Sequence, residues 1–544
     1  MTRPRVGLVA IVLSAIVASS CSSSGTSTPD TESASTSSTT TAIVVTTTAT
    51  APEPTVPPTV APAPYTQPGW LAAENARPGT DAWRITVDVA PAKRGTRDGA
   101  IEGYAGTTSV RNGERLDLYV ATGAPSWHFE AYRMGYYGGQ LARLVYTSPE
   151  YPEQVQLGVS TDKSTRMTRA EWGVSASVDI DDSWPPGSYL VKLVSSTGEA
   201  HYVPVTVRRD DALGGLVLVS AVTTWQAYNP WGSRTLYENF GPGSRFDRAL
   251  VVSFDRPYDR AYNWGAADFL THELPLISLI EELGLDTVYV TDIDLHTGID
   301  LTGRTAILTT AHDEYYSRPM RTTLERARDA GVNLAFFGAN AVYRNVRLEP
   351  NAEGVENRQM PNYRVATADP IPDDPDLTTT QWRNAPLNDP ENALIGVQYF
   401  AAGIKTAMRL VDTDNWIFEG TSAVNGTTMR NLVSIEADGL GPAGREPANL
   451  QVLATSPVTY KDVVYRHAMT YYAAESGAGV FATGTIAWIH ALDAESWGDQ
   501  TTTDIVRGAT ANVLRAFATG PAGVAHPSVA TASRYRVGLA PVSD

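Results

Sequence analysis

The chain has 544 residues, a formal net charge of −17 and an isoelectric point near 5.0. Because nucleic acids are bound by basic surfaces and no cluster of Lys or Arg occurs, this composition argues against a nucleic-acid partner. The only cysteine is Cys21, so the chain forms no internal disulfide.

Residues 1–21 are predicted to form a lipoprotein signal. Two arginines precede an apolar run over 6–18, which is too short for a permanent membrane-spanning helix. Cys21 comes just after this run and two small serines, which resembles the position of the lipid-accepting cysteine of a bacterial lipoprotein. The alternative is an ordinary signal peptide that is cleaved nearby. We therefore expect an exported, extracytoplasmic protein that a lipid on Cys21 anchors to the bacterial cell membrane.

Residues 22–68 consist mainly of Ser, Thr, Pro and Ala. Such a segment buries too little apolar surface to offset the entropy lost on ordering, so we predict a disordered Ser/Thr/Pro-rich linker. The remaining chain is too long for one ordinary domain. We predict one domain over 69–210, a second over 211–525 and a short C-terminal tail over 526–544.

The first predicted domain contains short segments in which apolar and polar residues alternate, such as 115–121 and 188–194. This period of two is typical of strands with one buried face, and turns rich in Gly and Pro separate the segments. The pattern predicts an Ig-like antiparallel β-sandwich.

The second predicted domain alternates strands and helices. Residues 216–220 and 305–310 are short, continuously apolar runs of the kind found in buried parallel strands. After the second run, Ser317 and Pro319 mark the start of a helix, and an apolar strand follows that helix at 332–337. Such strand–helix–strand units predict a doubly wound α/β fold with a parallel sheet.

Polar residues follow these strands at their carboxyl ends, where open α/β sheets bind ligands. His312 and Glu314 come after the second apolar run, and Tyr228 comes after the first. The strand-to-helix turn at 311–317, the elbow, has no cysteine and no Gly-x-Ser-x-Gly motif, and the eight histidines are not spaced as zinc ligands. The donors that remain are carboxylates, phenols and one imidazole. Because a phenol ionises near neutral pH only beside a strong Lewis acid, this set indicates ferric iron rather than zinc or magnesium.

Three blocks resemble the C-terminal region of the large subunit of N,N-dimethylformamidase: 224–237 (TWQAYNPWGSRTLY), 312–317 (HDEYYS) and 469–488 (MTYYAAESGAGVFATGTIAW). The resemblance implies a fold like that of class I glutamine amidotransferases, without the amidotransferase cysteine. It also implies a mononuclear iron held by two tyrosines and one glutamate, with a histidine close by. The implied reaction is hydrolysis of a C–N bond other than a peptide bond in a small amide-like substrate.

By these motifs, the resemblance implies that Glu314 is the carboxylate ligand of Fe(III), His312 the neighbouring histidine and Tyr228 one phenolate ligand. Tyr189 is the candidate for the second tyrosine, and Glu436 is a candidate second carboxylate with a catalytic role. Four of these assignments have a structural alternative. Glu314 is also suited to a helix N-terminus, His312 to a satisfied position at a strand end, and both tyrosines to an ordinary core.

Two functions from different classes follow from these patterns. The first is an exported, iron-dependent hydrolase of amide or related C–N bonds. The second is a non-catalytic envelope lipoprotein that binds glycan or a wall component through an aromatic surface, with which twelve tryptophans and twenty-five tyrosines are compatible. Bound iron separates the two hypotheses, because ferric phenolate absorbs visible light. The patterns leave the oligomeric state open.

Overall fold

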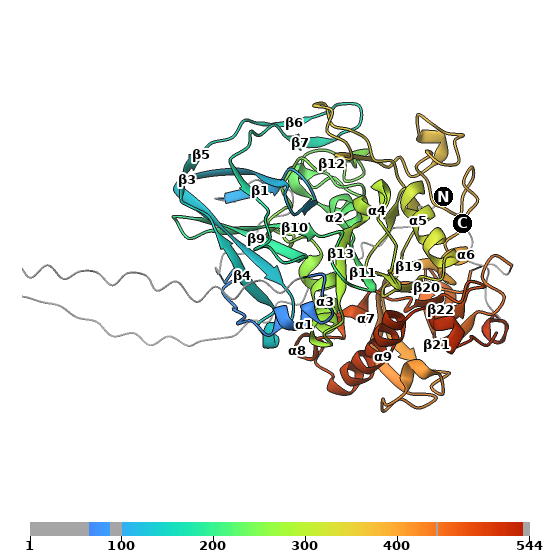
Figure 1. Cartoon of the computed structure of the whole chain (residues 1–544). Coiled ribbons are helices and arrows are strands. Elements are labelled where there is room, and N and C mark those ends of the chain that lie inside the picture. Colours follow the sequence, from blue (N-terminus) through green and yellow to red (C-terminus); the bar gives the residue numbers. More distant parts are fainter. Residues whose placement is uncertain (1–64, 87–100, 442–443, 537–544) are drawn as a thin grey trace, which may run out of the picture. The chain divides into compact units, whose positions relative to one another are not determined.

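The computed structural model describes residues 65–86, 101–441 and 444–536 (Figure 1). These residues belong to one compact unit, Ala61–Asp544. The predicted lipoprotein signal, Cys21 and all but the end of the predicted linker lie outside the described residues. Among the described helices, none is long and apolar enough to cross a membrane.

The first sheet has eight strands and is built around one very long strand, β3, which alternates buried and more exposed residues over most of its length. Its pairs are antiparallel except for β2 with β10, which run parallel. The sheet order is β1 (Ile101–Ala105), β3 (Arg115–Met134), β9 (Gly187–Ser195), β10 (Ala200–Arg208) and β2 (Ser109–Arg111), and β4 (Ala142–Thr147), β5 (Tyr151–Gln154) and β8 (Ala176–Asp179) also pair with β3.

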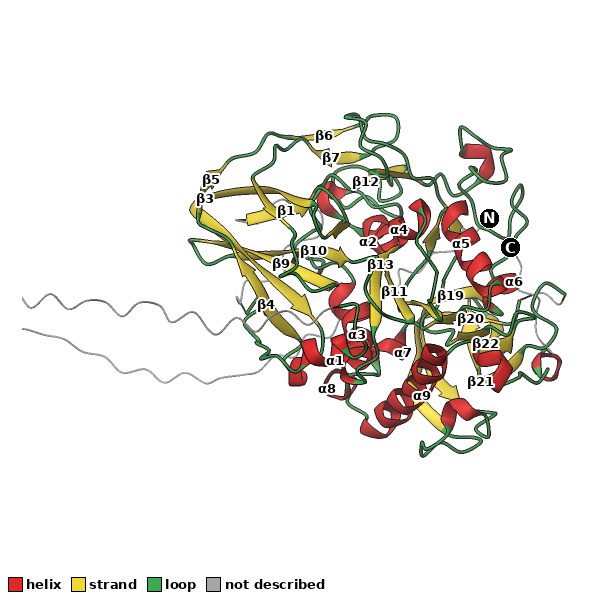
Figure 2. Cartoon of the chain, viewed as in Figure 1, coloured by secondary structure: helices red, strands yellow, loops and turns green. Residues whose placement is uncertain are grey.

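The second sheet has nine strands and is mixed (Figure 2). Its first five strands run parallel, and the others pair antiparallel. The order is β13 (Thr287–Thr291), β11 (Leu216–Ser220), β14 (Ala306–Thr309), β16 (Asn333–Phe336), β23 (Gly479–Ala482), β22 (Val463–Ala473), β20 (Thr428–Gly439) and β19 (Gln398–Arg409), with β21 (Gln451–Tyr460) paired to β22.

Six helices form two groups, within each of which the helices contact one another (Figure 2). One group is α2 (Val222–Tyr228), α4 (Asp292–Thr297) and α5 (Arg318–Asp329); the other is α3 (Leu274–Glu282), α7 (Ala487–His490) and α9 (Gln500–Thr519). Other short elements are α1 (Trp70–Asn75), α6 (Asn392–Ile395), α8 (Ala494–Trp497), α10 (Ala522–Ala525) and the paired strands β6 (Val159–Thr161) with β7 (Thr168–Ala170), β12 (Val251–Ser253) with β18 (Gln359–Pro361), and β15 (Tyr315–Tyr316) with β17 (Arg344–Asn345).

The predicted fold, a doubly wound α/β domain of glutamine amidotransferase type after an Ig-like antiparallel sandwich, is wrong. The structure is rich in strand, at 33% strand against 22% helix. A doubly wound sheet needs a helix between successive strands, whereas β19, β20, β21 and β22 follow one another without an intervening α-helix. These four long strands pair with their neighbours as antiparallel partners, which short connections allow.

A buried ion pair joins the first sheet to a helix of the second. Arg133 on β3 donates two hydrogen bonds to the Glu281 carboxylate on α3, at 2.8 and 2.9 Å, and neither side chain is exposed. Tyr289 on β13 also donates its hydroxyl to Glu281. The contact requires a glycine at 135, because a Cβ there would lie 1.9 Å from Glu281 Oε2. This desolvated pair is therefore one of the contacts that attach the two sheets, together with the buried pair of Arg208 on β10 with Asp294 on α4.

We expect Arg133→Met to lower the free energy of unfolding by about 3–5 kcal/mol, because it leaves the Glu281 charge buried without its partner. Urea denaturation followed by circular dichroism measures this loss. Arg115→Met is the matched control, since Arg115 lies on the same strand and its ion pair with Asp179 is exposed. An equal loss in both variants would contradict the importance of the buried pair.

Candidate metal centre

The elbow between β14 and α5 carries the first part of the centre. The Glu314 backbone N–H donates to Thr224 Oγ1 at 2.9 Å, which attaches the elbow to α2. Ser317 caps α5 by accepting from the Met320 backbone N–H. The elbow also passes close to the end of β16, where a Cβ at Gly338 would lie 1.9 Å from the Ala311 carbonyl oxygen. Contacts on both sides therefore fix the direction of the Glu314 side chain.

Two phenols converge on the fully buried Glu314 carboxylate. Tyr228 Oη donates to Oε2 at 2.7 Å, and Tyr237 Oη donates to Oε1 at 2.5 Å. The two rings stack with centroids 4.6 Å apart. Arg344 Nε on β17 also donates to Oε1, at 3.1 Å. One carboxylate thus receives three donors from three segments of the chain.

An imidazole and a second carboxylate lie beside this group. His312 Nε2 is 3.6 Å from Glu314 Oε2 and 3.5 Å from Glu436 Oε2, the latter on β20. His312 Nε2 and Glu436 Oε2 are both buried and have no hydrogen-bond partner among the described residues. The His312 ring lies 5.0 Å from the Tyr228 ring. The arrangement leaves two polar atoms that face each other without a full hydrogen bond.

Burial and mutual charge set the protonation of these groups. Burial opposes the charged ring of His312, but the Glu436 and Glu314 carboxylates raise its pKa to about 9. Burial also opposes the Glu314 charge, yet His312 and Arg344 lower the pKa of this carboxyl to about 2. Burial raises the pKa of Glu436 to about 7.

The two phenols are held in their neutral form. Burial, followed by the Glu314 charge, raises the pKa of Tyr228 and of Tyr237 well above 10. Each hydroxyl therefore keeps its proton and donates it to the carboxylate. Only a strong cation placed between the three oxygens would ionise the phenols at neutral pH.

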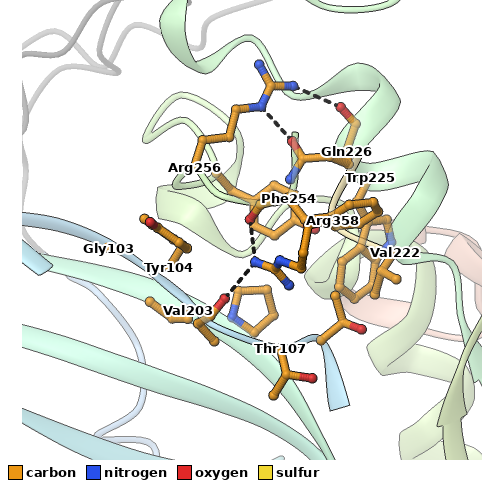
Figure 3. A pocket seen from close by; sticks show the side chains of 14 residues that line it. Gly103, Tyr104, Thr107, Val203, Val222, Trp225, Gln226, Phe254, Arg256 and Arg358 are labelled. Carbon is orange, nitrogen blue, oxygen red and sulfur yellow. Dashed lines mark hydrogen bonds between the residues drawn. The ribbon is translucent and has the colours of Figure 1, made fainter. Parts of the chain in front are cut away.

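A neighbouring arginine fixes the segment that links the two tyrosines. Arg256 is buried and donates Nε to Gln226 Oε1 at 2.9 Å and Nη2 to the Gln226 carbonyl at 3.2 Å (Figure 3). Its Nη1 donates to the carbonyls of Trp231 and Arg234. A cavity of about 30 Å³ lies against this arginine, but no residue of the centre lines it. It is far smaller than the pockets that usually hold small-molecule substrates.

Residues 128–503 match the family model described as N,N-dimethylformamidase beta subunit-like, C-terminal. The chain belongs to this family. The matched span is more than half of the sequence and contains every residue of the centre, which confirms the resemblance seen in the three sequence blocks. In general terms the protein is therefore a dimethylformamidase-like hydrolase. No curated protein matches the chain significantly.

The structure of this dimethylformamidase-like chain brings together four of the five residues singled out at the centre by sequence, namely His312, Glu314, Tyr228 and Glu436. Tyr189 is not among them. It lies on β9 in the core of the first sheet and donates its hydroxyl to the Pro185 carbonyl at 2.7 Å. The second phenol at the centre is Tyr237, which the sequence analysis did not single out. Its signal was its position as the last residue of the resembling block 224–237.

The donor set fits a ferric ion. Tyr228, Tyr237 and Glu314 supply hard oxygen atoms, which suit a small trivalent cation. Within the described parts of the chain, no group of three His, Cys, Asp or Glu side chains is arranged to hold a metal ion. A metal at this centre therefore depends on the phenols.

We expect the His312 ring to titrate near pH 9 in the metal-free protein, because two carboxylates stabilise its charge. Since this pKa lies above the ordinary value of 6.5, the stability that the charge contributes is complete below pH 6.5 and is lost as pH rises through 9. NMR of the ring protons measures the titration. Glu436→Gln should lower the pKa, and His467 is the internal control, because burial lowers its pKa to about 4. Titration of His312 below pH 6.5 would refute this account.

Proposed function

We propose that the protein is an exported, iron-dependent hydrolase of amide or related C–N bonds other than peptide bonds, acting on a small amide-like substrate. The observation that carries this proposal is the convergence of Tyr228 and Tyr237 on the two oxygens of Glu314. Membership of the dimethylformamidase-like family supports the hydrolytic class. The proposed export and lipid anchoring rest on Cys21 and the apolar run before it.

Tyr228, Tyr237 and Glu314 would hold Fe(III). Together they supply three negative charges when the phenols are ionised, which matches a trivalent ion. Bound there, the ion supplies the Lewis acidity that polarises the carbonyl group of an amide. Arg344 stays hydrogen-bonded to the Glu314 carboxylate and holds its orientation, as outer residues commonly do around metal ligands.

His312 and Glu436 would move protons during hydrolysis. A pKa of about 7 suits Glu436 to accept a proton from water as the water oxygen bonds to the amide carbon. The charged His312 ring carries a proton on a nitrogen that makes no hydrogen bond within the described chain, and it can give this proton to the leaving nitrogen as the C–N bond breaks. The 3.5 Å separation lets Glu436 return a proton to His312 after small movements.

The distribution of tryptophan favours the enzyme over the glycan-binding alternative. All twelve tryptophans lie in the described parts of the chain, nine are buried and none is exposed. An aromatic platform for glycans needs accessible rings, whereas these rings fill cores.

We expect Tyr228→Phe and Tyr237→Phe each to lose the visible absorption and most of the bound iron of the wild-type protein, because each removes one of the three ligands. Absorption spectra and metal analysis of the purified proteins measure both effects. Tyr189→Phe is the matched control and should keep the wild-type spectrum, since its hydroxyl is bonded to Pro185 in the first sheet. An unchanged spectrum in both site variants would refute the phenolate centre.

We expect His312→Ala to keep iron and colour but to lose roughly 10²–10⁴-fold in turnover, the range that a positioned acid or base contributes. The assay is amine release from a panel of N-substituted formamides and acetamides. Loss of iron in this variant would make His312 a ligand, and full turnover would remove it from the reaction.

A further inference from the structure

Arg364 presents an unused hydrogen-bonding edge next to the centre. Its guanidinium carbon lies 3.9 Å from the centroid of the Tyr237 ring, so the flat cation covers one face of a candidate ligand. Its Nε and Nη2 atoms are buried and make no hydrogen bond with any described residue. Among the described ion pairs, none includes Arg364.

Two other arginines lie nearby: Arg344 meets Tyr237 at Glu314 Oε1, and Arg248 is close enough to Arg364 for their charges to interact. Arg344 uses Nε on Glu314, whereas its Nη1 is buried and has no hydrogen-bond partner in the described chain. Arg248 donates only to backbone carbonyls, those of Ala249, Asn362 and Tyr363. Burial, together with the charge of Arg364, lowers the pKa of Arg248 to about 10. The side of the centre occupied by Tyr237 is therefore rich in positive charge and in buried donors without acceptors.

Buried donors without acceptors are costly, so this arrangement fits an anionic ligand that supplies the missing oxygens. Nε and Nη2 form one edge of the planar guanidinium group. That edge matches the two oxygens of a carboxylate through two parallel hydrogen bonds, which is the strong, bidentate form of this contact.

We propose that the substrate amide carries a carboxylate, as an N-acylated amino acid does, and that the Nε–Nη2 edge of Arg364 binds this carboxylate. Arg344 Nη1 supplies a further donor on the same side. This proposal rests on the proposed amide hydrolysis at the centre and names its substrate class.

The position of Tyr237 makes carboxylate binding by Arg364 compatible with amide hydrolysis at Glu314. Its hydroxyl meets Glu314 at the reacting end, and its ring face meets Arg364. In an N-acylated α-amino acid, a single carbon separates the carboxylate from the amide nitrogen. Tyr237 contacts both Arg364 and Glu314, and the proposal places the substrate amide at the Glu314 end of this side chain.

The test compares two probes of equal length, N-acetylglycine and its neutral analogue N-acetylglycinamide. Calorimetry on the full protein in the His312→Ala background, with and without iron, gives both dissociation constants while turnover is suppressed. N-acetylglycine should bind at least about 10-fold more tightly than the neutral probe, since charge-assisted hydrogen bonds distinguish them. Arg364→Gln should weaken N-acetylglycine binding by roughly 10- to 100-fold and leave N-acetylglycinamide unchanged.

Two further variants make the binding test more specific. Arg364→Lys keeps the charge but removes the planar edge, so it should also lose most of the preference, and it replaces Arg364→Gln if that variant does not fold. Arg245→Gln is the control, because Arg245 is exposed on the loop that follows Tyr237 and should leave both constants unchanged.

Equal affinity for the two probes in the parent protein, or an undiminished preference in Arg364→Gln, overturns the proposal. Tighter competition by inorganic phosphate than by N-acetylglycine also overturns it, because the site would then bind anions in general. A colourless protein that binds no iron refutes the proposed function, whereas a preference for N-acetylglycine in that protein still supports the carboxylate site. Hydrolysis of neutral amides with no preference for N-acetylglycine supports the proposed function and overturns the carboxylate site.

Discussion

The centre depends on the cost of burying one carboxylate charge. Glu314 has no exposed surface, and an isolated carboxylate in such a place would be strongly destabilising. The chain compensates by bringing Tyr228, Tyr237 and Arg344 to the two carboxylate oxygens from separate segments. Because each donor must lie within hydrogen-bond distance, the position of Glu314 sets the positions of α2, the loop after it and β17.

The mixed sheet explains how the remaining groups reach this carboxylate. The parallel half ends β14 in an elbow that carries His312 and Glu314, as parallel strands commonly place ligand-binding residues. The antiparallel half brings Glu436 on β20 to within 3.5 Å of His312. A sheet made only of strand–helix–strand units would bury both faces of β20 under helices. The departure from the doubly wound fold is therefore what lets strand residues take part in the centre.

Local patterns were sufficient for the elements around the elbow. The apolar run 216–220 is β11, and Ser317 with Pro319 correctly marks the start of α5. These features depend on residues close together in the chain. Whether Tyr189 or Tyr237 is the second phenol of the centre depends instead on which loop folds back over α2. That folding is decided by non-local contacts, such as those of Arg256 with the Trp231 and Arg234 carbonyls. The antiparallel half was missed for the same reason, because alternation predicts a strand but not its partner.

The pairing of two protonated phenols with one carboxylate also determines how the proposed metal ion would bind. Tyr228 and Tyr237 would each have to give up a hydroxyl proton to hold a trivalent cation, so binding would exchange two protons for the ion. The affinity for the cation should therefore rise steeply with pH. Acid should release the cation while the Glu314 carboxylate and the two phenols stay hydrogen-bonded. Under the proposed export and iron binding, the acidity and iron supply outside the cytoplasm would therefore determine how much of the protein carries metal.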